Sequence, residues 1–147
     1  MIFDVSYNIG TREKTQVCLP KMREGKLDGQ YLACWVRQGP CDEENSLKAI
    51  DRVDELIRHI YRQVEMNGEQ CAIARTPDDL SRLKTEGKKA FYIGIENGYG
   101  IGKDLKNITR FHDAGVTYIT LCHTRNNDIC DSSSDTTARW NGFKSLR

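Results

Sequence analysis

The sequence predicts an α/β fold in which parallel strands alternate with helices. Three apolar runs of strand length, at residues 31–36, 90–95 and 116–122, are separated by segments with helical periodicity. Two of these runs are followed at once by a polar side chain, Glu96 and His123. Because the carboxyl ends of parallel strands carry the chemistry of such folds, we expect both residues at one rim of one sheet.

The composition is that of an ordinary globular domain. The chain has 147 residues, 38% of them hydrophobic and 29% charged, which suits one domain. A net charge of +1 gives no electrostatic reason to expect nucleic acid or an anionic membrane as a partner. No apolar run approaches the roughly 18 residues of a membrane-spanning helix, and residues 1–4 lack the features of a signal peptide. The six cysteines contain no C-x-x-C pair, so most are expected to be reduced thiols.

The first half of the chain contains one strong helical pattern. Residues 1–30 are expected to form an extended lead-in with short turns, because glycines and a proline interrupt every period. Turn-forming residues flank 31–36, which favours a buried strand over a short buried helix. Apolar residues recur every three or four positions over 46–66 and predict an amphipathic helix, with acidic residues 42–44 at its amino end. Asn67, with the glycine after it, is expected to end this helix in a left-handed conformation.

Shorter elements follow. After a short strand or extended link at 71–74, a second helix is predicted over 76–87, from an N-cap threonine and a first-turn proline to a closing glycine. A third helix is predicted over 105–114 with Asp104 as its N-cap. Its apolar face is expected to hold three residues: Leu105, Ile108 and Phe111. The polar segment 124–147 has no period and is expected to be a long loop.

Glu96 and His123 are the candidate functional residues. A carboxylate at the end of an apolar strand has lost hydration that a metal, a cation or hydrogen bonds must replace; the alternative is a carboxylate bonded to loop amides. A rim histidine can bind metal, polarise a carbonyl or move a proton, and its alternative is a structural imidazole. His59 and His112 fall within helical patterns and are expected at the surface. No serine or cysteine nucleophile is paired with the two candidates, which disfavours a catalytic triad.

The glycine-rich segment 98–103 does not fit a phosphate-binding loop. A G-x-G-x-x-G motif would need glycine in place of Lys103, and a Walker loop would need glycine in place of Asn97. We expect these glycines instead to let the backbone pass close to a ligand or metal at the strand end.

Several blocks of the chain resemble, in order, the membrane (renal-type) dipeptidase family, the zinc metallopeptidases of the amidohydrolase-like (β/α)8 class. Residues 19–25, followed by Gly29-Gln30-Tyr31, resemble the family segment LPRLREGGVGAQF. Residues 94–98 (GIENG) resemble its GVEGG, and residues 121–131 resemble its LTHSCNTPWAD. Blocks in the right order are far more specific than any one of them alone.

The resemblance implies a partial (β/α)8 barrel with about three parallel strands, residues 1–147 being its N-terminal portion, incomplete at both ends. It implies zinc-dependent hydrolysis of dipeptides by a metal-activated water, with two zinc ions in the full-length family. Glu96 would bridge these ions, and His123 would be the catalytic residue that contacts substrate and steadies the tetrahedral intermediate. Asn126 would contact substrate with the loop after the fourth strand, where Asp131 also lies. A dipeptide is the expected partner, a homodimer is compatible with the family, and the compartment is left open.

The chain also departs from the family pattern. The family opens with a strand that ends in an H-x-D pair of zinc ligands, which this sequence lacks. One alignment puts Ser6 and Asn8 at those positions; the preferred one places that strand upstream, because residues 7–12 resemble the linker that follows it in bacterial members. The later histidine ligands and a substrate-binding arginine would lie beyond Arg147. Arg125 replaces a cysteine that is disulfide-bonded in mammalian members, so that bridge is not expected.

Two functions therefore remain. The leading one is a zinc dipeptidase of which this stretch alone is inactive. The alternative is a non-catalytic α/β binding or assembly module, a degenerate paralogue without the metal site, which a strand at residues 2–8 carrying Ser6 and Asn8 would favour.

Overall fold

The computed structural model describes residues 7–11 and 15–144 and shows an α/β arrangement of parallel strands. In chain order the elements are α1 (Leu19–Glu24), β1 (Gly29–Trp35), α2 (Glu43–Met66), β2 (Cys71–Ile73), α3 (Pro77–Thr85), β3 (Lys89–Glu96), the 3-10 helix η1 (Gly98–Ile101), α4 (Lys106–Asp113) and β4 (Val116–Ile119). The predicted fold class is confirmed. No helix in the described part of the chain is long and apolar enough to cross a bilayer.

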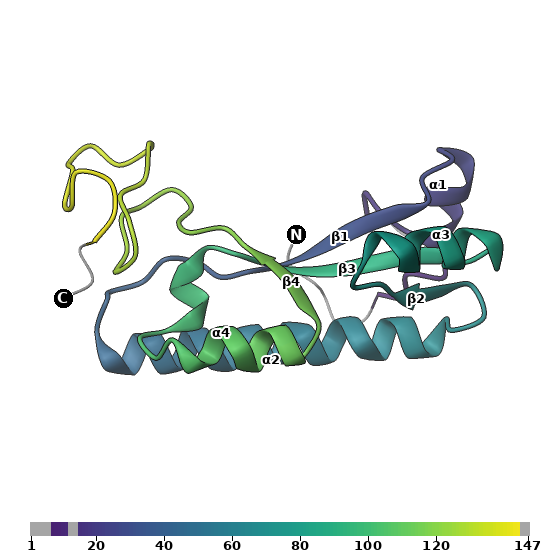
Figure 1. Cartoon of the computed structure of the whole chain (residues 1–147), viewed down its shortest axis with the longest axis horizontal. Coiled ribbons are helices and arrows are strands. Elements are labelled where there is room, and N and C mark those ends of the chain that lie inside the picture. Colours follow the sequence, from purple (N-terminus) through teal and green to yellow (C-terminus); the bar gives the residue numbers. More distant parts are fainter. Residues whose placement is uncertain (1–6, 12–14, 145–147) are drawn as a thin grey trace.

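β3 is the central strand of the sheet. β1 pairs with it in parallel along one edge, with Gly29 opposite Ala90 and Trp35 opposite Glu96. The other edge is divided, since β2 pairs with the amino-terminal part of β3 and β4 with its carboxyl-terminal part, both in parallel. The carboxyl ends of β1, β3 and β4 therefore point toward the same end of the molecule, where the loop after β4 also lies (Figure 1).

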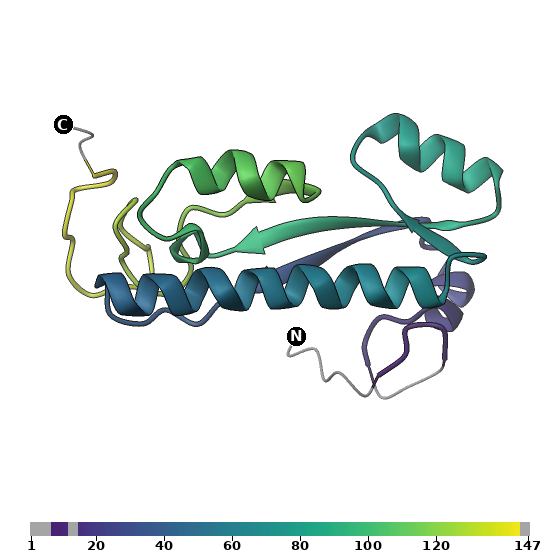
Figure 2. The ribbon, with the colours of Figure 1, turned by 90° about the horizontal axis from the view of Figure 1, so that it is seen from below.

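Helices cover the two faces of the sheet unequally. α2 and α4 lie side by side on one face (Figure 2), and the main core forms beneath them. Alternate residues of the strands point into this core and pack against the apolar stripe of α2: Leu32, Cys34, Phe91, Ile93, Ile95, Val53, Ile57 and Ile60. The shorter α3 covers the amino-terminal part of the other face, where its Leu83 packs against Ala74 and Ala90. The carboxyl-terminal part of that second face has no helix over it.

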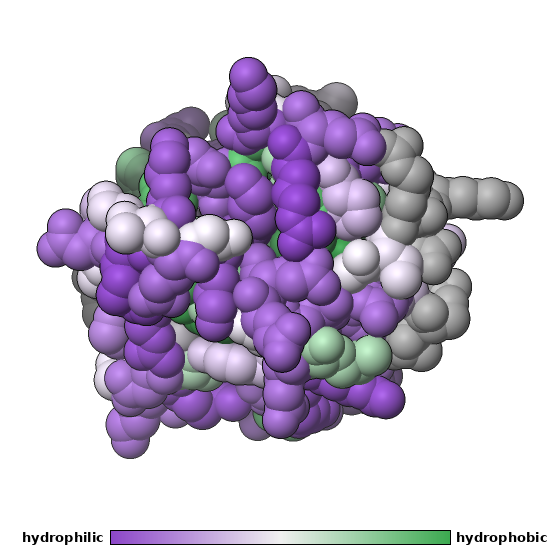
Figure 3. Space-filling view, turned by 90° about the vertical axis from the view of Figure 1, so that its right-hand side faces the viewer, coloured by the Kyte–Doolittle hydropathy of each residue, from purple (hydrophilic) through white to green (hydrophobic). Residues whose placement is uncertain are grey.

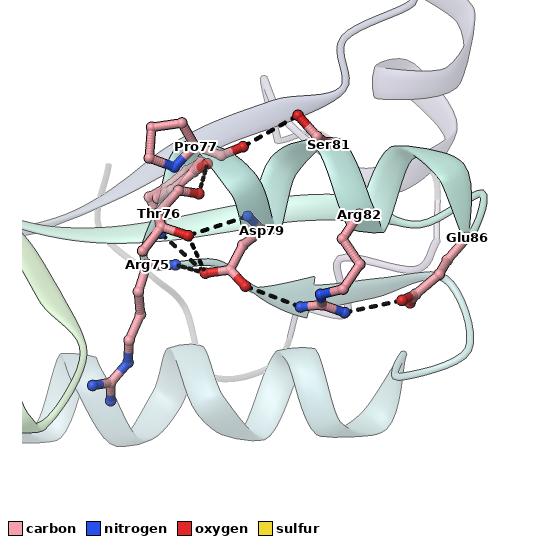
Figure 4. A network of polar contacts seen from close by, with 8 residues as sticks. Arg75, Thr76, Pro77, Asp79, Ser81, Arg82 and Glu86 are labelled. Carbon is pink, nitrogen blue, oxygen red and sulfur yellow. Dashed lines mark hydrogen bonds and ion pairs between the residues drawn. The ribbon is translucent and has the colours of Figure 1, made fainter.

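The start of α3 is fixed by a capping box. The Thr76 hydroxyl accepts from the Asp79 amide at 3.2 Å, and the Asp79 carboxylate accepts from the amides of Arg75 and Thr76 at 2.9 and 3.0 Å (Figure 4). Arg82 then joins Asp79 to Glu86 along the helix surface. The Arg75 amide, the Arg82 guanidinium and the Thr76 amide together hold the pKa of Asp79 well below its ordinary value. The end of the molecule formed by these elements and α1 is mostly hydrophilic (Figure 3).

Four local expectations are corrected. Residues 19–24, expected in an extended lead-in, form α1, since Pro20 suits a first helical turn and two residues of that turn, Leu19 and Met22, are buried. α2 begins at Glu43 rather than 46, because Asp42 accepts from the Asn45 amide as N-cap. It does not end in a left-handed residue: Asn67 has φ −123°, and its carbonyl accepts from two later amides. α4 exposes Leu105 and Ile108 and buries only Phe111; Leu105 is its N-cap residue, although Asp104 accepts from the Lys106 amide.

The largest correction concerns the last strand. β4 ends at Ile119, not at residue 122, so His123 lies in the following loop. The reason is the loss of a partner. β3 ends at Glu96 and the backbone turns into η1, so residues beyond 119 have no neighbouring strand. The Thr120 hydroxyl instead accepts from the Asn97 amide at 2.8 Å.

Candidate functional site

Glu96 and His123 meet at the carboxyl ends of the strands. His123 Nε2 lies 3.3 Å from Glu96 Oε1, and each side chain keeps 37% of its surface exposed. Glu96 is the last residue of β3, and the loop after β4 carries His123 back toward it. The prediction that both residues share one rim is confirmed, although His123 arrives from a loop and not from a strand end. Their chemical roles stay predictions.

Two aromatic residues complete the rim, and the sequence analysis did not identify them. Trp35 is the register partner of Glu96, and the centroids of its ring and the His123 ring are 6.0 Å apart with an edge-to-face orientation. Tyr118 lies on β4; burial first, and then the negative charge of Glu96, raises its pKa. Period-two alternation places Tyr31 and Trp35 of β1 on one face, but only the register with β3 shows that this face holds Glu96.

Gly94 makes room for Tyr118. A Cβ at residue 94 would lie 2.1 Å from Tyr118 Cε1, so the ring crosses β3 directly over the glycine. Tyr118 then stacks edge-on against Tyr31, which stacks face-on against Tyr92, with both pairs of ring centroids 4.9 Å apart. Rigid aromatic rings thus form the floor below the rim.

Asn97 joins the loops that follow β1, β3 and β4. Its side chain is fully buried, and its Nδ2 donates to the Val36 carbonyl and to Gln38 Oε1, both at 3.2 Å. Its Oδ1 accepts from the Tyr99 amide and from Asn127 Nδ2, also at 3.2 Å. All the hydrogen-bonding positions of this amide that a buried site can use are occupied. Glu96 is therefore followed by a residue held from three directions.

The backbone of Asn97 is in an unusual conformation, with φ +88° and ψ +104°. A residue with a Cβ is strained there, and a buried side chain that makes several hydrogen bonds can offset that strain. The family segment GVEGG has glycine at this position. Asparagine in its place was the available sequence signal, since asparagine tolerates positive φ better than most residues.

Asn127 organises the loop that carries His123. Its Nδ2 donates to the Leu121 carbonyl at 2.8 Å, and its Oδ1 accepts from the amides of Ile129 and Cys130. The Ser132 hydroxyl donates to the His123 carbonyl at 2.6 Å, which closes the loop behind the imidazole. Through Asn97, this loop is tied to the residue after Glu96.

Asn126 and Asp131 make contacts inside the same loop. The Asn126 side chain donates to the Thr137 carbonyl and accepts from the Ser132 amide. Burial alone would raise the pKa of Asp131, but the backbone amides of Trp140, Gly142 and Arg139 donate to it and the net effect lowers the pKa. Both residues are engaged in shaping the loop, and a substrate contact by Asn126 stays a prediction.

The glycines after Glu96 have a packing role that differs from the expected one. A Cβ on Gly98 would lie 2.6 Å from Ile129 Cδ1, and one on Gly100 would lie 2.8 Å from Val53 Cγ2. They let η1 pack closely against α2 and the loop after β4, rather than against a ligand.

Other predicted residues lie away from the rim. His112 is exposed on α4, whereas His59 on α2 is half-buried and not at the surface as expected. Asn8 Oδ1 accepts from the Gly10 amide and from Asn67 Nδ2, at the amino-terminal end of the sheet. The alignment that puts Asn8 at a zinc-ligand position therefore places it at the wrong end. Ser6 lies outside the described residues, as does most of the strand considered at 2–8.

The rim offers part of a metal site. Carboxylate oxygen and imidazole nitrogen are zinc ligands, and Glu96 and His123 present one of each within contact of each other and of solvent. In the described residues no group of three or more histidine, cysteine, aspartate or glutamate side chains converges. The pair fits a fraction of a coordination sphere, and further ligands would have to come from outside the described residues.

Comparisons with known proteins identify relatives of the whole described chain. Residues 2–146 match the family described as membrane dipeptidase (peptidase family M19). The chain is 28% identical over 134 residues to dipeptidase ataJ of Aspergillus terreus, covering 87% of this chain and 33% of that protein. It is 24% identical over 128 residues to the uncharacterized dipeptidase C965.12 of Schizosaccharomyces pombe, covering 81% and 30%. The chain thus spans about a third of the length of these relatives.

Solved structures agree on the fold. The probable dipeptidase PvdM of Pseudomonas aeruginosa matches with a TM-score of 0.76 and 25% identity, over 89% of this chain and 35% of that one. A metallopeptidase of Rhodobacter sphaeroides, liganded with a phosphinate mimic of L-Ala-D-Ala, matches with a TM-score of 0.71 and 17% identity, over 81% and 40%. The arrangement of strands and helices is that of part of a (β/α)8 barrel.

Proposed function

Because the chain belongs to the membrane dipeptidase family, we propose that residues 1–147 are the N-terminal portion of a (β/α)8 barrel that hydrolyses dipeptides with zinc. The observation that carries this proposal is the 3.3 Å contact between Glu96 and His123 at the carboxyl ends of parallel strands. In barrels of this class that rim is where catalysis occurs. The homodimer suggested by the resemblance stays a prediction.

Each rim residue has a chemical role in this proposal. Glu96 would hold zinc through its carboxylate. Zinc, when bound, would supply an acidified water and a polarised scissile carbonyl. His123 Nε2, beside that carboxylate, is placed to donate a hydrogen bond to an oxygen that gains negative charge in the tetrahedral intermediate. Trp35 stands against the imidazole edge and limits both its rotation and the access of water.

The rim pair alone is a weak metal site. One carboxylate and one imidazole fall short of the ligand set that catalytic zinc needs. We therefore expect the 147-residue chain to bind less than one equivalent of zinc and to leave dipeptides intact. A longer protein would add the missing H-x-D pair upstream and two histidine ligands downstream.

The test compares this chain with one extended in both directions along its reading frame. Elemental analysis gives the zinc content, and a panel of glycyl dipeptides gives the turnover. The extended protein should bind two zinc ions and hydrolyse dipeptides; Glu96→Gln should lower its zinc content, and His123→Asn should lower turnover with zinc retained. Matched controls are Glu86→Gln on α3 and His112→Asn on α4, which change the same groups away from the rim.

Two results would contradict the proposal. Two zinc ions bound by the 147-residue chain, with turnover, would show that the site is complete without further ligands. An extended reading frame without the H-x-D pair and later histidines would instead support the non-catalytic module.

A further inference from the structure

Two thiols lie together in the loop that carries His123. Cys122 precedes the histidine, and its Sγ donates to the Asp131 carbonyl at 3.4 Å. That contact places it beside Cys130, and the two thiols are hydrogen-bonded to each other. Cys130 is buried, with 5% of its surface exposed, whereas Cys122 is half-buried and solvent reaches it.

The other four cysteines have different surroundings. Three of them are buried in the core under the helices or at its edge: Cys18, Cys34 and Cys71. Burial raises the pKa of Cys34 to about 12 and that of Cys71 to about 11, so both stay protonated and unreactive at neutral pH. Cys41 is half-buried and accepts from Gln38 Nε2 at 3.5 Å. Within the described residues, Cys122 and Cys130 are the pair of thiols in contact.

We propose that Cys122 and Cys130 form a redox-active pair that a small-molecule disulfide, such as glutathione disulfide, converts into an intramolecular disulfide. The bond would join the two sides of a loop that the Ser132 hydroxyl already closes on the His123 carbonyl. Oxidation would therefore fix the backbone on both sides of His123. The reaction needs neither zinc nor a dipeptide, so it stands or fails separately from the proposed hydrolysis.

The step has a defined order. Cys122, the accessible sulfur, loses its proton and attacks glutathione disulfide, forming a mixed disulfide and releasing one glutathione thiolate. Cys130 then loses its proton and attacks the Cys122 sulfur, releasing the second glutathione. The two protein thiols are oxidised, glutathione disulfide is reduced to two glutathione molecules, and the two protons pass to those thiolates. Burial, and then Cys122, raises the pKa of Cys130 to about 11, so the second attack is the slower one.

The experiment is incubation of the folded chain with glutathione disulfide, followed by thiol titration, intact mass and a non-reducing peptide map. The chain should lose two of its six thiols, keep no glutathione, and yield a peptide that links residues 122 and 130. Cys130→Ser should stop at the mixed disulfide on Cys122, and Cys122→Ser should leave Cys130 unmodified. Cys41→Ser is the matched control and should behave as the unmodified chain.

A second measurement tests the consequence for the loop. Amide hydrogen exchange over residues 121–132 should be slower in the oxidised chain and should return to its initial rate after reduction. A stable glutathione adduct at Cys122 in the chain with both thiols, a bridge to Cys41, or a bridge that forms only in denaturant would overturn the proposal. Unchanged exchange over 121–132 in the bridged chain would refute the link to His123.

Discussion

Asn97 provides a direct test of how the rim is held together. Asn97→Gly removes the side chain and its four hydrogen bonds but relieves the strain of φ +88°. Asn97→Ala removes the same hydrogen bonds and keeps the Cβ that makes this conformation costly. The two substitutions therefore separate the hydrogen bonds from the backbone strain.

The expected magnitudes follow from these contacts. A hydrogen bond contributes about 0.5–1.5 kcal/mol net, and some partners of Asn97 keep other contacts, so Asn97→Gly should cost about 2–4 kcal/mol. Asn127 Nδ2, for example, still donates to the Leu121 carbonyl. Asn97→Ala should cost about 1–2 kcal/mol more, which is the penalty of a Cβ at positive φ.

Urea denaturation followed by circular dichroism gives these free energies of unfolding. A double-mutant cycle with Asn127→Ala measures the contact between the two loops, and its coupling energy should be about 1 kcal/mol. If Asn97→Ala is as stable as Asn97→Gly, the strain argument is wrong. If neither substitution lowers stability, the amide does not hold the rim.

Three further predictions concern α3 and the aromatic floor. Thr76→Ala should lower the free energy of unfolding by about 1 kcal/mol through loss of the N-cap, as measured by urea denaturation; no change would contradict the capping box. Because the pKa of Asp79 is lowered in the folded chain, its stabilisation is present above its unfolded value of about 4 and is lost as the pH falls through the folded value, so acid should destabilise Asp79→Asn less than the unmodified chain. Gly94→Ala should cost about 1–3 kcal/mol and change the near-ultraviolet circular dichroism, because the new Cβ displaces the Tyr118 ring; an unchanged spectrum would refute the close contact.

The sequence predicted the elements whose signals are local. The apolar period of α2, the Thr76-Pro77 start of α3 and the run that forms β3 all depend on neighbouring residues, and the structure confirms them. The end of β4 could not be predicted in this way. Residues 120–122 continue an apolar run, yet they leave the sheet because their partner strand has turned into η1.

The site was predictable in part for the same reason. Glu96 and His123 each follow a strand-like run, so their common rim could be inferred from the parallel order. Trp35 and Tyr118 could not be assigned to it, since the facing side of a strand depends on register across the sheet. Asn97 was noted only because it interrupts a glycine motif, and its partners lie 30 to 61 residues away in sequence.

Cobalt binding followed by nuclear magnetic resonance tests the shared rim most directly. Co²⁺ is a paramagnetic substitute for zinc and broadens the signals of nuclei near it. A titration of the 147-residue chain should broaden the His123 ring signals before those of His112, and Glu96→Gln should abolish that difference. Broadening that starts at His112 and its neighbour Asp113, or that is unchanged by Glu96→Gln, would contradict a metal-binding rim formed by Glu96 beside His123.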